Sequence, residues 1–406
     1  MYIERDLERK FELMNANFKA ILLTGARQVG KTTMLKNLSK KSNRTYVTLD
    51  DANIRDLAKT DPKLFFQTYK TPILIDEIQK APELFEYIKI ICDESDEKGI
   101  FWLTGSEQFK MMKKVSETLA GRICILNLYS LSQKEISEVK TDELTFSLDS
   151  LKERQKLFNK NNILNVYNFI WNGGMPDVQN KDSEIRNEYF NSYIETYLMK
   201  DIMEFGGISD TVRFSKFLKI SAALISQQVN YKTLAENADI SEPTAKSWLN
   251  ILEGLGIIYL LRPFENNALK RLTKTPKLYF CDTGLASYLS MWLTPDTLMN
   301  GAASGAFFEN YVVMELIKNF AYSKNKVDFF YYRDSNAKEI NLFLIENNII
   351  HPFEIKKSAS PDKREIKKYN VIDKSTLKKG YGGIICMSDE VLPIDEENCY
   401  LPCNII

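Results

Sequence analysis

The strongest constraint on the fold is a short apolar run, Ile21-Leu22-Leu23, that leads directly into a glycine-bearing loop and Gly-Lys-Thr. This stretch matches the phosphate-binding P-loop pattern GxxxxGK[ST]. A chance match is disfavoured because an apolar strand precedes the loop and a helix-compatible segment, 31–38, follows it. The residues expected to contact a nucleotide are Gly25, Ala26, Arg27, Gln28, Val29, Gly30, Lys31, Thr32 and Thr33.

Each part of this loop has a chemical reason. Glycines let the backbone curl so that successive N–H groups face phosphate oxygens, and the helix that follows offers its positive N-terminus to the same anion. Lys31 is expected to reach the β- and γ-phosphates, and Thr32 to place its hydroxyl on Mg²⁺. The motif therefore predicts ATP and Mg²⁺ as ligands.

A second acidic motif follows on a later strand. Residues 46–49 and 72–77 are apolar runs with strand character, and strands that alternate with helices imply a parallel sheet. The second run ends in Asp76 and Glu77. Asp76 is expected to hold Mg²⁺ through water and Glu77 to polarise the attacking water. The alternative is an acidic pair that only caps a helix.

Two further strands complete the predicted sheet. Residues 99–106 give a fourth strand that ends in hydroxyls, so Thr104 or Ser106 is a candidate sensor of the γ-phosphate, and residues 123–128 give a fifth. The expected fold is an α/β P-loop ATPase with a parallel sheet in the order 5-1-4-3-2.

With these motifs, the sequence resembles a large family of prokaryotic AAA-class ATP-binding proteins that carry a C-terminal domain of unknown function. The resemblance rests on Leu-Thr-Gly-Ala-Arg-Gln-Val-Gly-Lys-Thr-Thr, Leu-Ile-Asp-Glu-Ile-Gln, Leu-Thr-Gly-Ser and Leu-Ala-Gly-Arg, and continues in 173–176, 193–202, 279–285 and 354–356. It implies that Arg122, just before the fifth strand, is an arginine finger for a neighbouring subunit in a homo-oligomer. A surface ion pair is the alternative for Arg122.

Composition limits the remaining possibilities. A chain of 406 residues suggests two to four domains. Lys+Arg and Asp+Glu are equal at 54 each, so nucleic-acid binding would need a local basic patch. The start of the chain lacks signal-peptide character, and no apolar run is long enough for a membrane span, which predicts a cytoplasmic protein. Six cysteines without C-x-x-C spacing and one histidine predict buried free thiols.

Residues 211–280 are expected to form a winged helix-turn-helix, after an ATPase core at 1–138 and a connection with a helical segment at 139–210. Three helical stretches, 214–225, 232–237 and 242–252, precede a strand at 256–261. The presumed recognition helix carries few groups that read base edges. Basic residues where the wing should lie are candidates for sequence-independent phosphate contacts: Lys270, Arg271, Lys274 and Lys277. A protein-packing role is the alternative.

The last part, 281–406, resembles a restriction-endonuclease-like core. Glu354 and Lys356 match its Glu-x-Lys element, and Glu309 matches the helix carboxylate. Asn341 stands where an Asp is usual, and a neutral amide removes one anion from a Mg²⁺ site. A degenerate nuclease domain is therefore expected.

The leading function is Mg²⁺-dependent ATP hydrolysis used as a switch or motor on a nucleic-acid partner such as DNA. Two alternatives stay open. The first is a nucleotide-gated protein-interaction module that does not touch nucleic acid. The second is an ATP-controlled nuclease.

Overall fold

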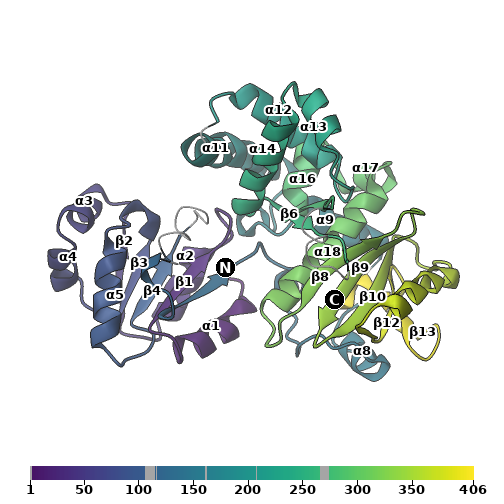
Figure 1. Cartoon of the computed structure of the whole chain (residues 1–406), viewed down its shortest axis with the longest axis horizontal. Coiled ribbons are helices and arrows are strands. Elements are labelled where there is room, and N and C mark those ends of the chain that lie inside the picture. The colour runs from purple at the N-terminus through teal and green to yellow at the C-terminus, as the bar shows by residue number, and fades with distance from the viewer. Residues whose placement is uncertain (1, 106–114, 116, 161, 207, 266–273) are drawn as a thin grey trace. The chain divides into compact units, whose positions relative to one another are not determined.

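The structure is a computed structural model that describes residues 2–105, 115, 117–160, 162–206, 208–265 and 274–406 (Figure 1). The chain divides into two compact units. The N-terminal unit comprises Met1–Ser130 with Gly254–Gly256, and the C-terminal unit comprises Leu131–Glu253 with Ile257–Ile406. Among the described residues, every helix is too short or too polar to cross a membrane.

The N-terminal unit is built on a parallel sheet. Its strands are β1 (Ala20–Thr24), β2 (Thr45–Thr48), β3 (Ile73–Asp76), β4 (Phe101–Thr104) and β5 (Ile123–Asn127). Their order is β2-β3-β4-β1-β5, and each neighbouring pair is parallel, which confirms the predicted order 5-1-4-3-2. Strands β1, β3 and β4 are buried along their whole length, as expected for continuous apolar runs covered on both faces.

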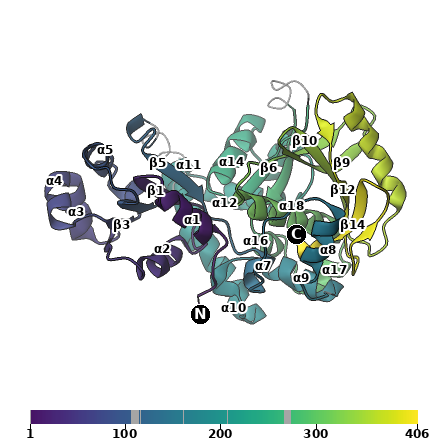
Figure 2. The same ribbon diagram turned by 90° about the horizontal axis from the view of Figure 1, so that it is seen from below.

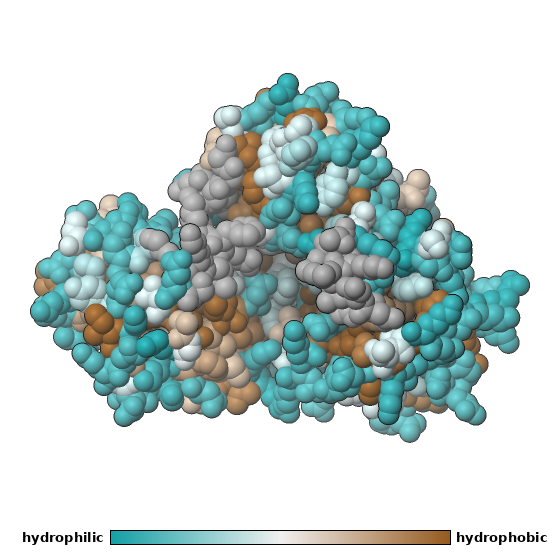
Figure 3. All heavy atoms as spheres, viewed as in Figure 1, coloured by the Kyte–Doolittle hydropathy of each residue, from teal (hydrophilic) through white to brown (hydrophobic). Residues whose placement is uncertain are grey.

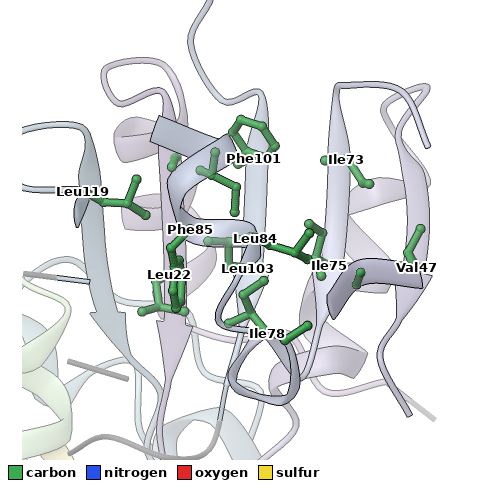
Figure 4. Packing of buried hydrophobic residues seen from close by; sticks show 14 of the residues in the cluster. Leu22, Val47, Ile73, Ile75, Ile78, Leu84, Phe85, Phe101, Leu103 and Leu119 are labelled. Carbon is green, nitrogen blue, oxygen red and sulfur yellow. The ribbon is translucent and has the colours of Figure 1, made fainter. Parts of the chain in front are cut away.

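Helices cover this sheet (Figures 1 and 2). They are α1 (Leu7–Asn15), α2 (Lys31–Ser39), α3 (Ala52–Thr60), α4 (Pro62–Thr68) and α5 (Leu84–Glu94), with a 3₁₀ turn at Ile78–Lys80. Figure 4 shows Leu22, Ile75 and Leu103 from three strands packed near Phe85 of α5 in one buried cluster. On the face seen in Figure 3, hydrophilic residues predominate over α3 and α4, while Leu64 of α4 and Ile90 of α5 stay exposed.

The C-terminal unit starts with helices. These are α7 (Gln133–Ile136), α8 (Leu148–Gln155), α9 (Ile163–Asn172), α10 (Ser183–Ser192), a π-helical stretch (Tyr193–Leu198) and α11 (Met199–Gly206). α8 lies within the stretch 139–210 that the sequence predicts to be a connection with a helical segment. The Ser147 hydroxyl caps this helix, and the buried Arg154 donates a hydrogen bond from Nε to the Ile405 carbonyl near the C-terminus. Figures 1 and 2 both place the C-terminus beside α8.

Three helices and a strand pair follow, in the order that predicted a winged helix. They are α12 (Thr211–Ala223), α13 (Tyr231–Ala238), α14 (Glu242–Gly254), β6 (Ile258–Leu261) and β7 (Lys277–Phe280). The two strands are antiparallel, with Ile258 opposite Phe280. Trp248 of α14 packs on Phe214 and Phe217 of α12, with ring centroids 5.0 and 5.3 Å apart.

The last part of the C-terminal unit is a mixed sheet with helices. The helices are α16 (Thr283–Leu289), α17 (Pro295–Asn300), α18 (Ser304–Ala321), the 3₁₀ helix η4 (Lys363–Lys374) and the short η5 (Cys403–Ile405). The strands are β8 (Asp328–Arg333), β9 (Glu339–Glu346), β10 (Ile349–Lys356), β11 (Lys378–Lys379), β12 (Gly382–Cys386), β13 (Leu392–Pro393) and β14 (Asn398–Pro402).

Strand order in this sheet is β13-β14-β12-β10-β9-β8, with β11 beside β10. β9 is antiparallel to both β8 and β10, whereas β10, β12 and β14 run parallel. The six cysteines are free thiols, and five of them are buried, which confirms that prediction.

Candidate functional site

The P-loop bridges β1 and α2, and its conformation depends on glycine. Gly25 and Gly30 have φ of 138° and 97°, values that side-chain-bearing residues rarely adopt. A Cβ on Gly25 would lie 2.2 Å from the Leu128 carbonyl oxygen. Gly30 is the N-cap of α2, so the helix N-terminus begins where the loop ends. Local sequence therefore sets both the curl of the loop and the direction of the helix.

Lys31 is buried inside this loop, with 6% of its surface exposed. Its Nζ donates to the carbonyl oxygens of Gly25 at 3.0 Å and Ala26 at 2.7 Å. Both acceptors are neutral, and a phosphate would be a stronger acceptor for the ammonium because charge-assisted hydrogen bonds are roughly twice as strong. The Lys31 ammonium is therefore held inside the loop, where a phosphate could bind it.

The two predicted magnesium-site residues are in direct contact. The Thr32 hydroxyl donates to Asp76 Oδ1 at 2.7 Å, and the Tyr46 hydroxyl donates to Asp76 Oδ2 at 3.2 Å. Asp76 ends β3 and is buried. A hydroxyl and a carboxylate side by side are the oxygen donors that Mg²⁺ prefers, so this pair fits the ion that the motif implies.

Thr104 lies at the end of β4, between β1 and β3, as the sequence predicted. Its side chain is fully buried; the hydroxyl donates to Asp76 Oδ1 and accepts from the Glu77 backbone N–H at 3.1 Å. The hydroxyl therefore contacts both residues of the acidic pair, because β3 and β4 are neighbours with their carboxyl ends level, and its role as a phosphate sensor stays a prediction. Ser106, the other sensor candidate, lies outside the described residues.

Glu77 adopts a left-handed conformation with φ 58° and ψ 46°. For a residue other than glycine this backbone costs about 1–2 kcal/mol. The Thr104 contact holds the backbone in place, and Gln79 Nε2 donates to the Glu77 carboxylate. The strain turns Glu77 sharply away from the strand direction directly after Asp76, which gives the two carboxylates separate surroundings.

Arg122 lies at the amino ends of the parallel strands, whereas the P-loop lies at their carboxyl ends. Its carbonyl accepts from the Ala20 N–H at 3.3 Å, at the start of β1, whereas the P-loop follows the end of β1. Five strand residues span about 16 Å at roughly 3.3 Å each. Arg122 donates to Asp93 from Nε at 2.5 Å and from Nη2 at 2.9 Å. These bonds raise the pKa of Arg122 and lower the pKa of Asp93.

Lys277 contradicts the predicted basic wing. It lies on β7, is 3% exposed, and pairs with Glu309 at 2.8 Å and Glu339 at 2.6 Å. Burial by itself lowers the pKa of Lys277, but the two carboxylates more than offset it and the pKa is raised. Lys274 is partly exposed and forms an ion pair with Glu265. Lys270 and Arg271 lie outside the described residues.

Glu309 and Asn341, from the predicted nuclease-like site, do meet. Asn341 Nδ2 donates to Glu309 Oε2 at 2.8 Å, and Asn341 Oδ1 accepts from the Ile355 N–H at 3.0 Å. The β9–β10 ladder ends at the neighbouring pair Leu342–Phe353, so the amide continues the pairing where the backbone stops. Lys277 and the Tyr279 hydroxyl, at 2.7 Å, bind the other oxygen of Glu309. A lysine thus neutralises the helix carboxylate.

Glu354 and Lys356 form a second group with η4. Glu354 Oε1 lies 3.2 Å from Lys356 Nζ and 3.1 Å from Lys368 Nζ, and Lys368 also pairs with Glu365 at 2.6 Å. Burial raises the pKa of Glu354, although the two lysines oppose this change. Among the described residues, no three His, Cys, Asp or Glu side chains gather in a metal-binding group.

Sequence reasoning missed the role of two glycine motifs. Gly173 and Gly284 approach so closely that a Cβ on Gly173 would lie 2.6 Å from the Gly284 nitrogen. Asp282 binds the Gly174 N–H at 2.8 Å, and the buried Arg186 donates to the Gly284 carbonyl at 3.0 Å. The paired glycines at 173–174 were the available signal. These motifs serve packing between α9, α10 and α16.

These features define an α/β P-loop domain: a five-stranded parallel sheet, a P-loop after β1, and an acidic pair at the end of β3, which is separated from β1 by β4. Residues 17–137 match a family described as AAA domain. Residues 163–296 match a domain of unknown function (DUF8612), and residues 304–406 match another (DUF4143). The chain therefore has an AAA-class P-loop domain followed by regions whose families have no assigned function.

Two mycobacterial relatives match the chain over most of its length. Uncharacterized proteins of Mycobacterium bovis and Mycobacterium tuberculosis are each 25% identical over 342 residues, which covers 84% of this chain and 71% of the relative. Among solved structures, the Walker-type ATPase of Pyrococcus abyssi is 15% identical with a TM-score of 0.44, covering 71% of this chain and 96% of its own. The RuvB Holliday junction branch migration motor of Thermotoga maritima is 17% identical with a TM-score of 0.30, covering 63% and 88%.

Proposed function

We propose that the chain binds ATP with Mg²⁺ at the P-loop and hydrolyses it. The observation that carries this proposal is the direct contact of Thr32 with Asp76, next to a buried Lys31 whose ammonium rests on neutral loop carbonyls. Lys31 would bind the β- and γ-phosphates, and Thr32 and Asp76 would hold the ion. The ion would supply neutralisation of phosphate charge.

Glu77 is proposed as the group that activates water. Its carboxylate follows Asp76 directly, and its strained backbone separates it from the metal-side carboxylate. Thr104 is assigned to positioning through its contacts with Asp76 and Glu77. Arg122 is assigned to the site of a neighbouring subunit in a homo-oligomer. In its own subunit it lies at the amino ends of the strands, away from the P-loop at their carboxyl ends.

The test separates binding from turnover. Lys31→Ala should abolish tight ATP binding in titration calorimetry, whereas Glu77→Gln should bind ATP normally and lose about 10²–10⁴ in turnover. Lys40→Ala, at an exposed lysine that caps the C-terminal end of the same helix, is the matched control and should behave as wild type. Unchanged turnover in Glu77→Gln would remove the catalytic assignment.

We further propose that turnover drives a switch or motor action on a nucleic-acid partner, through the winged-helix arrangement of α12–α14, β6 and β7. The burial of Lys277 removes one of the four candidate phosphate contacts of the wing, so the alternative of a protein-interaction module stays open. ATPase turnover measured with duplex, single-stranded and branched DNA decides between the nucleic-acid role and the protein-interaction role. Stimulation by DNA is expected only for the nucleic-acid role. Replacing Lys270, Arg271 and Lys274 by Ser should flatten the salt dependence of DNA affinity. An unchanged slope would exclude the wing as the binding surface.

The C-terminal domain is proposed not to cut DNA. Its carboxylates are neutralised by the ammonium groups of Lys277, Lys356 and Lys368. A divalent ion would have to displace these ammonium groups before it could bind. The domain then has a structural or regulatory use, and an ATP-controlled nuclease is disfavoured.

A further inference from the structure

Arg5 precedes α1 and is almost completely buried, with 4% of its surface exposed. Its guanidinium donates two hydrogen bonds to backbone carbonyls, from Nη1 to Val29 at 2.8 Å and from Nη2 to Tyr129 at 2.8 Å. Its backbone N–H donates to Glu8 Oε1 at 2.9 Å, which fixes the residue to the first turn of α1. The side chain is therefore held at both ends.

The two carbonyls belong to segments with different roles. Val29 is the P-loop residue directly before Gly30, the N-cap of α2. Tyr129 follows β5 and stands one residue before Ser130, the last residue of the N-terminal unit's main segment. Arg5 is thus a bridge between the phosphate-binding loop and the segment by which the chain leaves this unit.

The same exit segment, Leu128–Ser130, also contacts the start of the P-loop. The Leu128 N–H donates to the Thr24 carbonyl at 2.9 Å, and the space over Gly25 is closed by the Leu128 carbonyl. A glycine is required there because any side chain would collide with that oxygen. One end of the P-loop is therefore packed on the exit segment, and the other end is joined to it through Arg5.

A bound phosphate would change this arrangement at the point that Arg5 holds. The Lys31 ammonium donates to the Gly25 and Ala26 carbonyls, and a phosphate that recruits it would release both. Val29 lies three residues further along the same loop, so a change of the loop would reach the carbonyl that Arg5 binds. A planar guanidinium presents its N–H groups in a rigid fork, so a displacement of one acceptor is passed to the other. A lysine would place its three donors on one rotatable nitrogen atom, so it would not hold the two carbonyls at a fixed separation as the guanidinium does.

We infer that Arg5 is a positioning residue that couples phosphate binding in the P-loop to the exit segment Leu128–Ser130. The inference rests on the proposed nucleotide binding. In this proposal the N-terminal segment links the P-loop to the exit segment without contacting the phosphate itself. A shift of the Val29 carbonyl would move the Arg5 guanidinium, and the guanidinium would in turn move the Tyr129 carbonyl in the exit segment.

Amide hydrogen exchange of full-length protein, with and without Mg²⁺ and a non-hydrolysable ATP analogue, tests the coupling. The variants are Arg5→Lys and Arg5→Met, and the matched control is Arg9→Met, an exposed arginine on α1. In wild type and Arg9→Met, nucleotide should protect both residues 25–33 and residues 128–130. In both Arg5 variants, protection at 25–33 should remain, while the change at 128–130 should be lost and the KM for ATP should rise by about tenfold.

Three outcomes overturn the inference. A nucleotide-dependent change at 128–130 that survives in Arg5→Lys and Arg5→Met means that Arg5 only stabilises the fold. A wild type that protects 25–33 but not 128–130 means that no coupling exists. A wild type without protection at 25–33 removes the proposed nucleotide binding itself, which distinguishes that failure from the other two. Arg5→Lys keeps the charge and guards against a folding defect in Arg5→Met.

Discussion

The N-terminal P-loop site and the C-terminal Glu309–Asn341–Glu354 region contain similar groups but differ in what binds their charges. Both place carboxylates close to a lysine. In the P-loop site, Lys31 donates to neutral carbonyls and Asp76 accepts from hydroxyls. In the C-terminal unit, Glu309 and Glu354 are bound directly by lysines. A charged ligand can take the place of these carbonyl and hydroxyl partners, whereas Glu309 and Glu354 already have ammonium partners.

This difference shows that residues typical of a metal site can be present in an arrangement that does not favour metal binding. A buried ion pair already meets the requirement of each charge, and breaking it leaves an uncompensated charge behind. A hydroxyl on a carboxylate can instead share that carboxylate with a cation. Residue types alone therefore do not define a metal site, because the counter-ions decide whether it is open.

The largest expected effect tests whether the P-loop site is complete within one subunit. Arg122→Ala should lower ATPase turnover by about 10³–10⁵, the range for an arginine supplied to a phosphoryl-transfer site. Mixing Arg122→Ala with Lys31→Ala protein should restore part of the activity, because the second protein supplies the arginine to the first. Asp93→Asn, which releases Arg122 without removing it, is the control and should remain active. Mixtures that stay inactive would argue against a role in trans.

The next effect tests whether Lys277 closes the C-terminal region. Lys277→Met keeps the length of the side chain but removes the ammonium that Glu309 and Glu339 share, although Glu339 keeps its pair with Arg333. This change should reduce the free energy of unfolding by about 3–5 kcal/mol. Lys274→Met removes an exposed pair and should change it by less than about 1 kcal/mol. Urea unfolding followed by circular dichroism measures both. Equal losses in the two variants would show that the Lys277 pairs are not special.

A smaller effect tests whether the region can be reopened to metal. Wild type and Asn341→Asp should not cleave linear, circular or branched DNA with Mg²⁺ or Mn²⁺, because Lys277 still neutralises Glu309. Asn341→Asp combined with Lys277→Met should bind Mn²⁺ at least about tenfold more tightly than either single variant, since carboxylate oxygens suit a hard cation better than an amide. Cleavage by wild type that disappears in Lys356→Ala would overturn the degenerate assignment.

The smallest effect separates the two units by their response to mild acid. The single histidine of the chain, His351, lies in the C-terminal unit, with Nδ1 2.7 Å from the Tyr381 carbonyl oxygen. Burial lowers its pKa below the ordinary 6.5. The unfolded state therefore binds the proton first as the pH falls. Stability should decrease below about pH 6.5, by at most about 1.4 kcal/mol for each pH unit, until the folded state also binds the proton.

Hydrogen exchange from pH 7 to 5 measures this in each unit, once intrinsic exchange rates are corrected for pH. Protection in the C-terminal unit should fall in wild type and stay nearly constant in His351→Gln, while the N-terminal unit is the internal control because it has no histidine. The same slope in both proteins would mean that another group titrates.

Sequence by itself determined the P-loop, the strand order and the acidic pair. The P-loop and the acidic pair are contiguous, and their physical requirements are local: a glycine for a positive φ, an apolar run for a buried strand, a carboxylate at its end. The strand order followed from the fold class that these motifs indicate. The helices α12–α14 were also placed within a few residues, because caps and periodicity act over one turn.

Only the tertiary structure decided which charges meet. Lys277 and Glu309 are distant in sequence, and nothing in their local patterns shows that β7 packs against α18, where Lys277 is buried beside the partly buried Glu309. The same holds for Thr104 on Asp76 and for Arg5 on Val29 and Tyr129. Long side chains can satisfy their charges with any partner within reach, so their pairing follows from packing between elements and cannot be read from the residues that flank them.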